Sequence, residues 1–174
     1  MKLPKKIGLI WSQSFNGVIG RDGKMPDEFL SDLQHFKNLT INQTVIMGRK
    51  TWESLPIKPL PNRVNIVLTS DVDYQVPEGV QVIQSLEGLE VTTEYLYFIG
   101  GTKVLELGYP LANEIYVTVN KLECEGDTFA PVFPELLSQQ EGWSIKSSWS
   151  DTSEDGLKSN TKFFYVKTNG EDNV

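Results

Sequence analysis

Short, nearly continuous apolar runs recur along the chain and alternate with polar or amphipathic stretches. A run such as Ile7-Gly8-Leu9-Ile10-Trp11 indicates a strand that is buried on both faces of a sheet. The same pattern predicts strands over residues 44–48, 64–68, 79–84, 95–99 and 114–119. Residues 143–150 and 163–167 are expected to form an antiparallel hairpin, with a polar connection over 151–160 and a frayed tail over 169–174.

Amphipathic segments between these strands predict helices. Phe29, Leu33 and Phe36 fall on one stripe at helical spacing. The expected helices are residues 29–39, 49–55 and 102–107. Residues 14–28 are polar and rich in glycine, and a long loop of this kind inside a compact domain is usually functional.

Strands that alternate with short helices favour a mostly parallel sheet covered on both faces. We therefore expect an α/β fold that forms a single domain over residues 1–174. Its twisted sheet should contain about eight strands flanked by helices and should end in the antiparallel hairpin.

Charge and composition restrict the partners of this domain. The net charge of −7 argues against nucleic-acid binding, and no apolar stretch is long enough to span a membrane. The lone cysteine, Cys124, fits a reducing compartment, so we expect a cytoplasmic protein. With a single histidine, His35, which we expect at the surface, a metal site is not expected.

Two predicted strands end in glycine followed by basic residues. The segments are Gly48-Arg49-Lys50-Thr51 and Gly100-Gly101-Thr102-Lys103. Glycine lets a ligand approach the backbone, and the free amides of a helix start can hold a phosphate. The two segments together suggest a dinucleotide site without the usual G-x-G-x-x-G fingerprint, although each could also be an ordinary turn between a strand and a helix.

Asp32 is the main candidate for chemistry, because it is expected inside the first helix beside an apolar stripe. Asp32 and Phe36 are four residues apart and should project from one face. A carboxylate in that position could bind a cationic or hydrogen-bonding ligand. It could equally be an acidic residue of the first turn that favours the helix dipole.

Several motifs in order resemble the bacterial dihydrofolate reductase family. They begin with residues 7–13, Gly17-Val18-Ile19-Gly20 and Asp32-Leu33 with Phe36-Lys37, and continue with residues 45–55 and 59–68. Phe98-Ile99-Gly100-Gly101 and Glu125-Gly126-Asp127-Thr128 complete the order. The resemblance implies hydride transfer from NADPH to C6 of 7,8-dihydrofolate with protonation of N5, which yields tetrahydrofolate. It also implies a monomer.

The resemblance further implies roles for individual residues. Asp32, with Thr118, would be catalytic and would hold the 2-amino and N3 groups of the pterin. The implied substrate contacts are Ile10, Trp11, Leu33, Phe36, Leu60, Arg63 and Ile99, of which Arg63 would pair with the glutamate α-carboxylate. The implied NADPH contacts are Ser12, Ile19, Gly20, Met25, Gly48, Arg49, Lys50, Thr51, Thr69, Ser70, Ile99, Gly100, Gly101, Thr102, Lys103 and Val104. Arg49, Thr69 and Ser70 would bind the 2′-phosphate, and the Gly100–Gly101 peptide bond would be cis.

The sequence departs from the family pattern at four positions: Ser12, Asp27, Thr102 and Leu105 stand where the family usually has alanine, tryptophan, glycine and tyrosine. Two alternatives remain open. A related reductase could act on a ribosylated pyrimidine of riboflavin synthesis, although Arg63 and the helix with Asp32 favour folate. A homologue without activity could bind the nucleotide alone.

Overall fold

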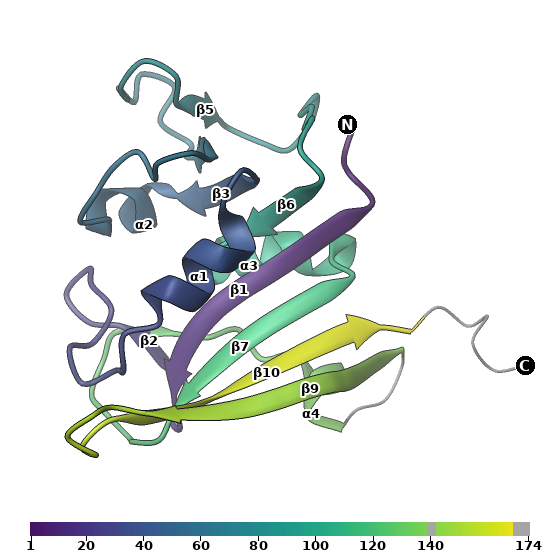
Figure 1. Ribbon diagram of the computed structural model, residues 1–174. Coiled ribbons are helices and arrows are strands. Elements are labelled where there is room, and N and C mark those ends of the chain that lie inside the picture. The colour runs from purple at the N-terminus through teal and green to yellow at the C-terminus, as the bar shows by residue number, and fades with distance from the viewer. Residues whose placement is uncertain (139–141, 169–174) are drawn as a thin grey trace, which may run out of the picture.

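The computed structural model describes residues 1–138 and 142–168, and the tail over 169–174 lies outside the described residues. An eight-stranded sheet forms the centre of the molecule in the order β5-β4-β3-β6-β1-β7-β10-β9 (Figure 1). A second sheet pairs β2 with β8. The predicted α/β fold with a C-terminal antiparallel hairpin is confirmed.

The elements follow one another closely along the chain. The strands are β1 (Lys6–Ser14), β2 (Val18–Gly20), β3 (Thr44–Gly48), β4 (Val64–Leu68), β5 (Gln81–Ile83), β6 (Tyr95–Phe98), β7 (Glu114–Asn120), β8 (Thr128–Phe129), β9 (Trp143–Thr152) and β10 (Ser159–Lys167). The helices are α1 (Leu33–Thr40), α2 (Arg49–Ser54), α3 (Thr102–Gly108), the 3-10 helix η1 (Tyr109–Leu111) and α4 (Pro134–Ser138).

Parallel pairing gathers the strand ends at one edge of the sheet. β1 pairs in parallel with β6 and with β7. β3 pairs in parallel with β4 and β6, and β4 pairs in parallel with β5. Because all these strands point the same way, the segments that follow them meet at the carboxyl edge, where α/β sheets bind ligands.

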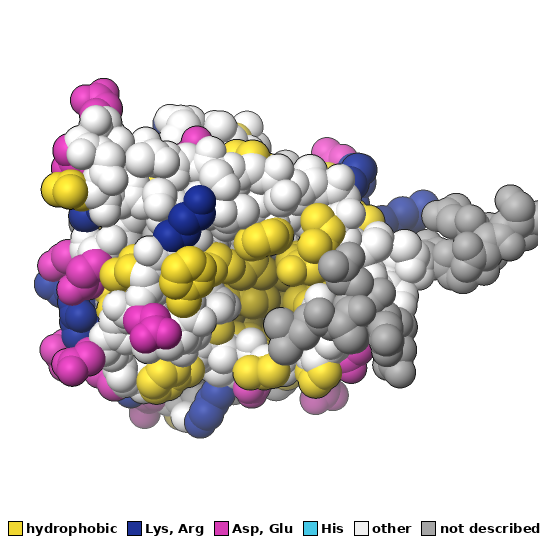
Figure 2. Space-filling view, turned by 90° about the horizontal axis from the view of Figure 1, so that it is seen from below, with side chains coloured by type: hydrophobic (Ala, Val, Ile, Leu, Met, Phe, Trp, Pro, Cys, Tyr) yellow, Lys and Arg dark blue, Asp and Glu magenta, His cyan; other side chains and the backbone are white. Residues whose placement is uncertain are grey.

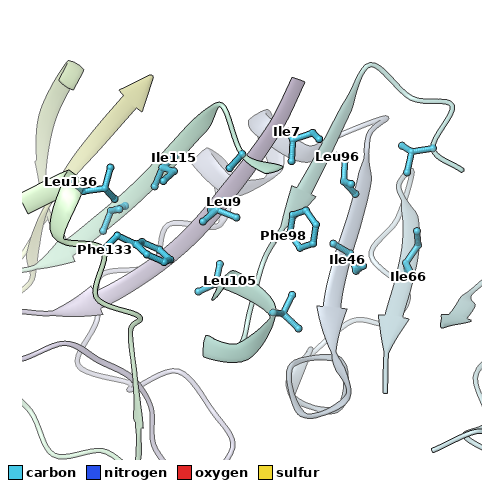
Figure 3. Close-up of a cluster of buried hydrophobic side chains, with 14 of the residues drawn as sticks. Ile7, Leu9, Ile46, Ile66, Leu96, Phe98, Leu105, Ile115, Phe133 and Leu136 are labelled. Carbon is cyan, nitrogen blue, oxygen red and sulfur yellow. The ribbon is translucent and has the colours of Figure 1, made fainter. Parts of the chain in front are cut away.

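Two hydrophobic clusters hold helices against opposite faces of the sheet. Alternation along β3 places Ile46 in one cluster and its neighbours Val45 and Met47 in the other. The first cluster contains Leu105 of α3, which is labelled near Leu9 and Phe98 in Figure 3. The second contains Trp52 of α2, and side chains of α1 pack against it. Helices therefore cover both faces, as the sequence predicted.

The first helix begins later than the sequence predicted. We expected it over residues 29–39, but α1 starts at Leu33, and Asp32 occupies the position just before it. The backbone N–H of Phe29 donates to Pro26 O and that of Leu30 donates to the side chain of Asn120. The Phe29 amide closes a local turn and the Leu30 amide bonds to a distant strand, and the helix begins only at Leu33, so Asp32 lies at the helix entrance and not inside the helix.

The C-terminal hairpin is longer than predicted. β9 extends to Thr152 and β10 begins at Ser159, so the connection is shorter than the predicted residues 151–160. The turn is closed by a hydrogen bond from Ser153 N to Lys158 O at 2.8 Å. Its Lys158 ammonium also donates to Asp27 O at 2.6 Å, which links the hairpin to the loop before α1.

Hydrophobic side chains also gather on the surface. Seen from below the view of Figure 1, they form a band across the middle of one face, and acidic and basic side chains lie mostly around its edges (Figure 2). Exposed apolar bands of this kind mark ligand grooves or interaction surfaces. Within residues 1–138 and 142–168, none of the helices has the length and apolar character needed to cross a membrane.

We expect Gly108→Ala to destabilise the fold. A Cβ at this position of α3 would lie 2.5 Å from Cγ of the buried Phe98 ring on β6. Such overpacking costs about 1–3 kcal/mol, which exceeds the roughly 1 kcal/mol of helix propensity that alanine gains over glycine. Urea unfolding followed by circular dichroism measures the difference in the free energy of unfolding.

Glu106→Ala is the matched control, because Glu106 is an exposed residue of the same helix. Its free energy of unfolding should stay within about 0.5 kcal/mol of the parent. A Gly108→Ala protein as stable as the parent would show that α3 does not approach β6 this closely.

Candidate active site

Asp32 and Thr118 meet at the entrance of α1. The Thr118 hydroxyl donates a hydrogen bond of 2.8 Å to Asp32 Oδ2. Thr118 lies on β7, is 5% exposed, and projects from the face that α1 covers, as does Tyr116 two residues earlier. The two residues predicted to be catalytic are therefore in direct contact, although they are 86 positions apart in the sequence.

A buried lysine approaches the other oxygen of the same carboxylate. Lys162 Nζ lies 3.2 Å from Asp32 Oδ1, and the two side chains are 5% and 19% exposed. Lys162 is the register partner of Thr118 in the antiparallel β7–β10 pair, so both residues project from one face of the sheet. Sequence reasoning missed Lys162, because it follows a polar segment that we had assigned to a loop.

Asn120 fixes the backbone that leads to Asp32. It is fully buried at the end of β7, and its Oδ1 accepts the Leu30 N–H at 3.1 Å. Its Nδ2 donates to Ser12 Oγ at 2.8 Å and to Gln13 O at 3.1 Å. Ser12, one of the departures from the family pattern, thus supplies an acceptor that alanine would lack.

Apolar side chains surround the approach to Asp32. Ile10 is buried in the cluster on the α1 face, and Phe36, Leu60 and Ile99 pack against that cluster. Leu33, in the first turn of α1, is 70% exposed. An exposed leucine beside a carboxylate suits a flat ligand ring, because the leucine can contact the ring and the carboxylate can accept hydrogen bonds from donors on the ring edge.

Trp11 lies on the other face of β1. It packs with the first hydrophobic cluster, where its ring meets the Phe133 ring edge-on at 6.0 Å. Its indole N–H donates to Gln13 Oε1 at 2.8 Å. Ile10 and Trp11, both predicted to contact substrate, therefore project to opposite faces of the sheet.

Arg63 lies beside Phe36 at the far end of the apolar residues. Its guanidinium carbon is 5.9 Å from the centre of the Phe36 ring, and its Nη1 donates to Thr40 Oγ1 at 3.1 Å. Its Nε donates to Pro61 O at 2.8 Å. Partial burial lowers the pKa of the Arg63 guanidinium from its ordinary value, but arginine stays charged at neutral pH.

The two glycine segments meet, as their places at the strand ends predict. Gly48 N donates to Gly100 O at 2.8 Å, and the Gly100–Gly101 peptide bond is cis, as the resemblance implied. A Cβ on Gly100 would lie 3.5 Å from Thr51 Oγ1, and one on Gly48 would lie 3.5 Å from Val104 Cγ2. The starts of α2 and α3 thus lie side by side around glycine backbone that carries no side chains, which suits the close approach of the pyrophosphate of a dinucleotide.

Basic and hydroxyl groups flank this backbone. Gly48 and Leu68 are register partners in β3 and β4, so Arg49 and Thr69 follow neighbouring strand ends. Arg49 Nη1 contacts Glu53 Oε1 at 3.2 Å, in a pair that is nearly half exposed. Ser70, Lys50 and Lys103 are exposed, which leaves their polar groups at the surface.

Two further departures from the family pattern have structural partners. The Thr102 hydroxyl donates to Phe129 O in β8, which joins the start of α3 to the small sheet. Leu105 is fully buried in the first hydrophobic cluster. Asp27 is exposed and does not cap α1, because that helix begins six residues later, at Leu33.

The glycine-rich loop is anchored to the segment before α4. β2 pairs with β8 through Val18 with Phe129 and Gly20 with Thr128, and Ile19 lies between them. Asp127 Oδ2 accepts the Asp22 N–H at 2.9 Å. Met25, predicted to contact the cofactor, is 55% exposed in the same loop.

We expected His35 at the surface, and it is only partly exposed there. It is half-buried on α1, and its ring meets the Tyr116 ring at 6.0 Å and the Trp149 ring at 5.4 Å, both edge-on. Burial lowers the pKa of His35 and outweighs the opposing effect of Asp32. In the part of the chain that the structure describes, no three His, Cys, Asp or Glu side chains come together as a metal site would require.

Comparisons with known proteins agree with this geometry. A family model described as dihydrofolate reductase matches residues 6–168. A dihydrofolate reductase of Mycobacterium leprae is 45% identical over 152 residues, which cover 82% of this chain and 91% of that protein. A dihydrofolate reductase of Staphylococcus aureus is 37% identical over 142 residues, which cover 82% of this chain and 85% of that protein. A solved dihydrofolate reductase from Enterococcus faecalis, complexed with NADP(H) and RAB-propyl, superposes with a TM-score of 0.81 at 33% identity. The superposition covers 97% of this chain and 100% of the Enterococcus faecalis chain. The chain belongs to the dihydrofolate reductase family.

Proposed function

We propose that this protein reduces 7,8-dihydrofolate to 5,6,7,8-tetrahydrofolate with NADPH. The observation that carries the proposal is the Asp32 carboxylate, which Thr118 orients at 2.8 Å beside apolar side chains. A pterin offers adjacent N–H donors on one edge of a flat ring, and an ionised carboxylate can accept from both. NADPH, when bound, supplies the hydride that reaches C6 of the pterin.

The chain's own residues then bind and orient the two rings. Asp32 holds the 2-amino and N3 groups of the pterin, and Thr118 keeps one carboxylate oxygen in place for them. Ile10, Leu33 and Phe36 supply apolar contacts for the ring, and Leu60 and Ile99 extend this surface. Arg63 pairs with the glutamate α-carboxylate, a task that suits the planar guanidinium.

The carboxylate also influences the proton that N5 must receive. Asp32 is placed to hold the opposite edge of the pterin, so the proton reaches N5 by way of water while Asp32 tunes the ring. The loop over residues 14–28, latched to β8, excludes bulk water from the reacting atoms when it is closed.

The cofactor residues fit a dinucleotide with a 2′-phosphate. The starts of α2 and α3 meet at Gly48, Gly100 and Gly101, where the absence of side chains lets a pyrophosphate approach the two helix starts. Lys50, Thr51, Thr102 and Lys103 lie in the first turns of the two helices. Arg49, with Thr69 and Ser70 at the neighbouring strand end, is placed to bind the 2′-phosphate.

We further propose that residues 1–174 act as one domain and as a monomer. The first and last strands of the chain belong to the same sheet, which supports a single domain. Light scattering of the purified protein tests the monomer, and a dimer mass at working concentration would contradict it. The cytoplasmic location expected from the sequence stays a prediction.

Removal of the carboxylate should abolish most of the turnover. In Asp32→Asn, one oxygen is replaced by an amide donor, which opposes the pterin donors and carries no charge. We expect kcat/KM for dihydrofolate to fall by roughly 100-fold or more, while the NADPH dissociation constant stays close to that of the parent. NADPH oxidation followed by absorbance and NADPH fluorescence titration measure the two quantities.

Thr118→Val is the matched variant, because it removes only the hydroxyl that orients the carboxylate. Its loss should be smaller, near 10-fold, since a single hydrogen bond to a charged group is at stake. Near-normal turnover of Asp32→Asn at neutral pH would refute the assigned role. Turnover of a ribosylated aminopyrimidine in place of dihydrofolate would refute the substrate.

The protein should prefer NADPH to NADH through Arg49. A charge-assisted hydrogen bond contributes about 1.5–3 kcal/mol, so Arg49→Ala should reduce the preference in kcat/KM by roughly 10- to 150-fold. Glu53→Gln is the control, because it removes the salt-bridge partner of Arg49 and keeps the guanidinium. Equal use of NADPH and NADH by the parent protein would show that the 2′-phosphate site lies elsewhere.

A further inference from the structure

Lys162 is held on three sides by oxygen atoms. Its Nζ donates to Asp151 Oδ2 at 2.7 Å and to Asn160 Oδ1 at 2.8 Å, and it lies 3.2 Å from Asp32 Oδ1. An ammonium has three N–H donors, so these contacts use all of them. Because Asn160 is fully buried and Lys162 is 4% exposed, the ammonium has little freedom to leave the carboxylate.

The register of the sheet builds this contact. Lys162 lies opposite Thr118 on β7 and opposite Trp149 on β9, and Asn160 lies opposite Asp151. Thr118 and Lys162 therefore reach Asp32 from neighbouring strands, and each binds a different carboxylate oxygen. The remaining lone pairs of both oxygens stay available for the two donors of a pterin edge.

A cavity approaches Asp32 from the side of the hairpin. Its volume is about 480 Å³ and its lining includes Asp32, His35, Trp149, Asp151 and Lys162. Of the predicted pterin contacts among the described residues, Asp32 alone lines it, so this cavity is distinct from the apolar approach. Asp151, whose side chain is 56% exposed, connects the buried lysine to solvent.

We propose that Lys162 is a positioning residue for the reaction, which orients the Asp32 carboxylate and stabilises its charge, and that Asp151 moderates its effect. The inference rests on the proposed role of Asp32 in binding the pterin. The Asp32 side chain has lost most of its hydration, and the ammonium at 3.2 Å stabilises the carboxylate in place of that water. Asp151 shares the charge of the ammonium, and so weakens the stabilisation that Asp32 receives.

The two neighbours of Asp32 therefore act in opposite directions. Lys162→Met, which has nearly the same shape without charge, leaves Asp32 with burial and with the negative charge of Asp151. Asp151→Asn leaves the whole charge of Lys162 to Asp32. Among the described residues, His35 on α1 also interacts electrostatically with Asp32, and burial lowers the pKa of this histidine.

The direct test is a carbon-13 NMR titration of the aspartate carboxyl carbons in the ligand-free protein. Asp32→Asn identifies the Asp32 signal by its loss. The midpoint of that signal should move up by about one pH unit or more in Lys162→Met, and down by a smaller amount in Asp151→Asn. Glu154→Gln, which removes a negative charge from the exposed turn of the same hairpin, should leave the midpoint within about 0.2 pH units.

Kinetics from about pH 5 to about pH 8 provide the functional readout. In Lys162→Met the loss in kcat/KM for dihydrofolate should grow toward acid pH, by up to about tenfold for each unit of midpoint shift, and should appear mainly in KM. In Asp151→Asn the change should reverse, so that the variant keeps more of its kcat/KM on acidification than the parent. A lysine that only supports the fold would produce a loss of the same size at every pH. The same profiles in a His35→Gln background remove the contribution of the histidine.

Midpoints of the Asp32 signal that move in opposite directions in Lys162→Met and Asp151→Asn support the proposal. Midpoints that move in the same direction, or do not move, overturn it. If Lys162→Met does not fold, Asp151→Asn decides alone, because a midpoint at or above that of the parent contradicts the arrangement. Full turnover of Asp32→Asn would instead refute the proposed function, and the NMR midpoints would still report whether Lys162 controls the carboxylate.

Discussion

A carboxylate whose side chain is 19% exposed has lost most of the water that stabilises its charge. In place of that water, two neighbouring strands each place one group against the Asp32 carboxylate, the hydroxyl of Thr118 and the ammonium of Lys162. The geometry depends on the register of β7 with β10, since a slip of one residue in β10 would turn Lys162 to the face opposite Thr118. The hairpin therefore supports the site as well as closing the sheet.

The same edge of the sheet serves the cofactor by a different means. Parallel strands end together, so the segments after β3, β4 and β6 meet without any long connection. Positive charge and bare backbone then accumulate locally in a chain whose net charge is −7. On the substrate side, the paired charges of Asp32 and Lys162 orient the ligand. On the cofactor side, the exposed basic residues attract the phosphates of the dinucleotide.

The sequence could predict what periodicity and strand ends determine. The bounds of β3 and β4 match the prediction, and the glycine segments after β3 and β6 meet as expected. The contact of Asp32 with Thr118 follows from the family resemblance and is confirmed, although no periodicity in either segment points to it. The predictions for the strands and the glycine segments succeed because each local pattern there is compatible with one structure.

Other features depend on tertiary contacts that a local pattern does not show. The apolar stripe that begins at Phe29 predicted a helix from that residue. Instead, the Phe29 N–H donates to Pro26 O, and the Leu30 N–H donates to the side chain of the distant Asn120. Lys162 follows a polar segment that indicates a solvated loop, and a buried lysine is rare unless it is paired. Asn160 is two positions away on the same strand, but the charged partners Asp32 and Asp151 lie on other segments of the chain, so the local sequence does not reveal that Lys162 is buried.

The central claim is that Asp32 is a fixed carboxylate which receives two donors of the pterin. Neutron diffraction from a deuterium-exchanged crystal of the protein with folate and NADP⁺ tests it most directly, because deuterium atoms become visible. The account predicts three deuterium atoms on Lys162 Nζ, none on Asp32, and pterin N3 and 2-amino deuterium atoms directed at the two Asp32 oxygens. A deuterium atom bound to Asp32, or a pterin held by other groups, would contradict it.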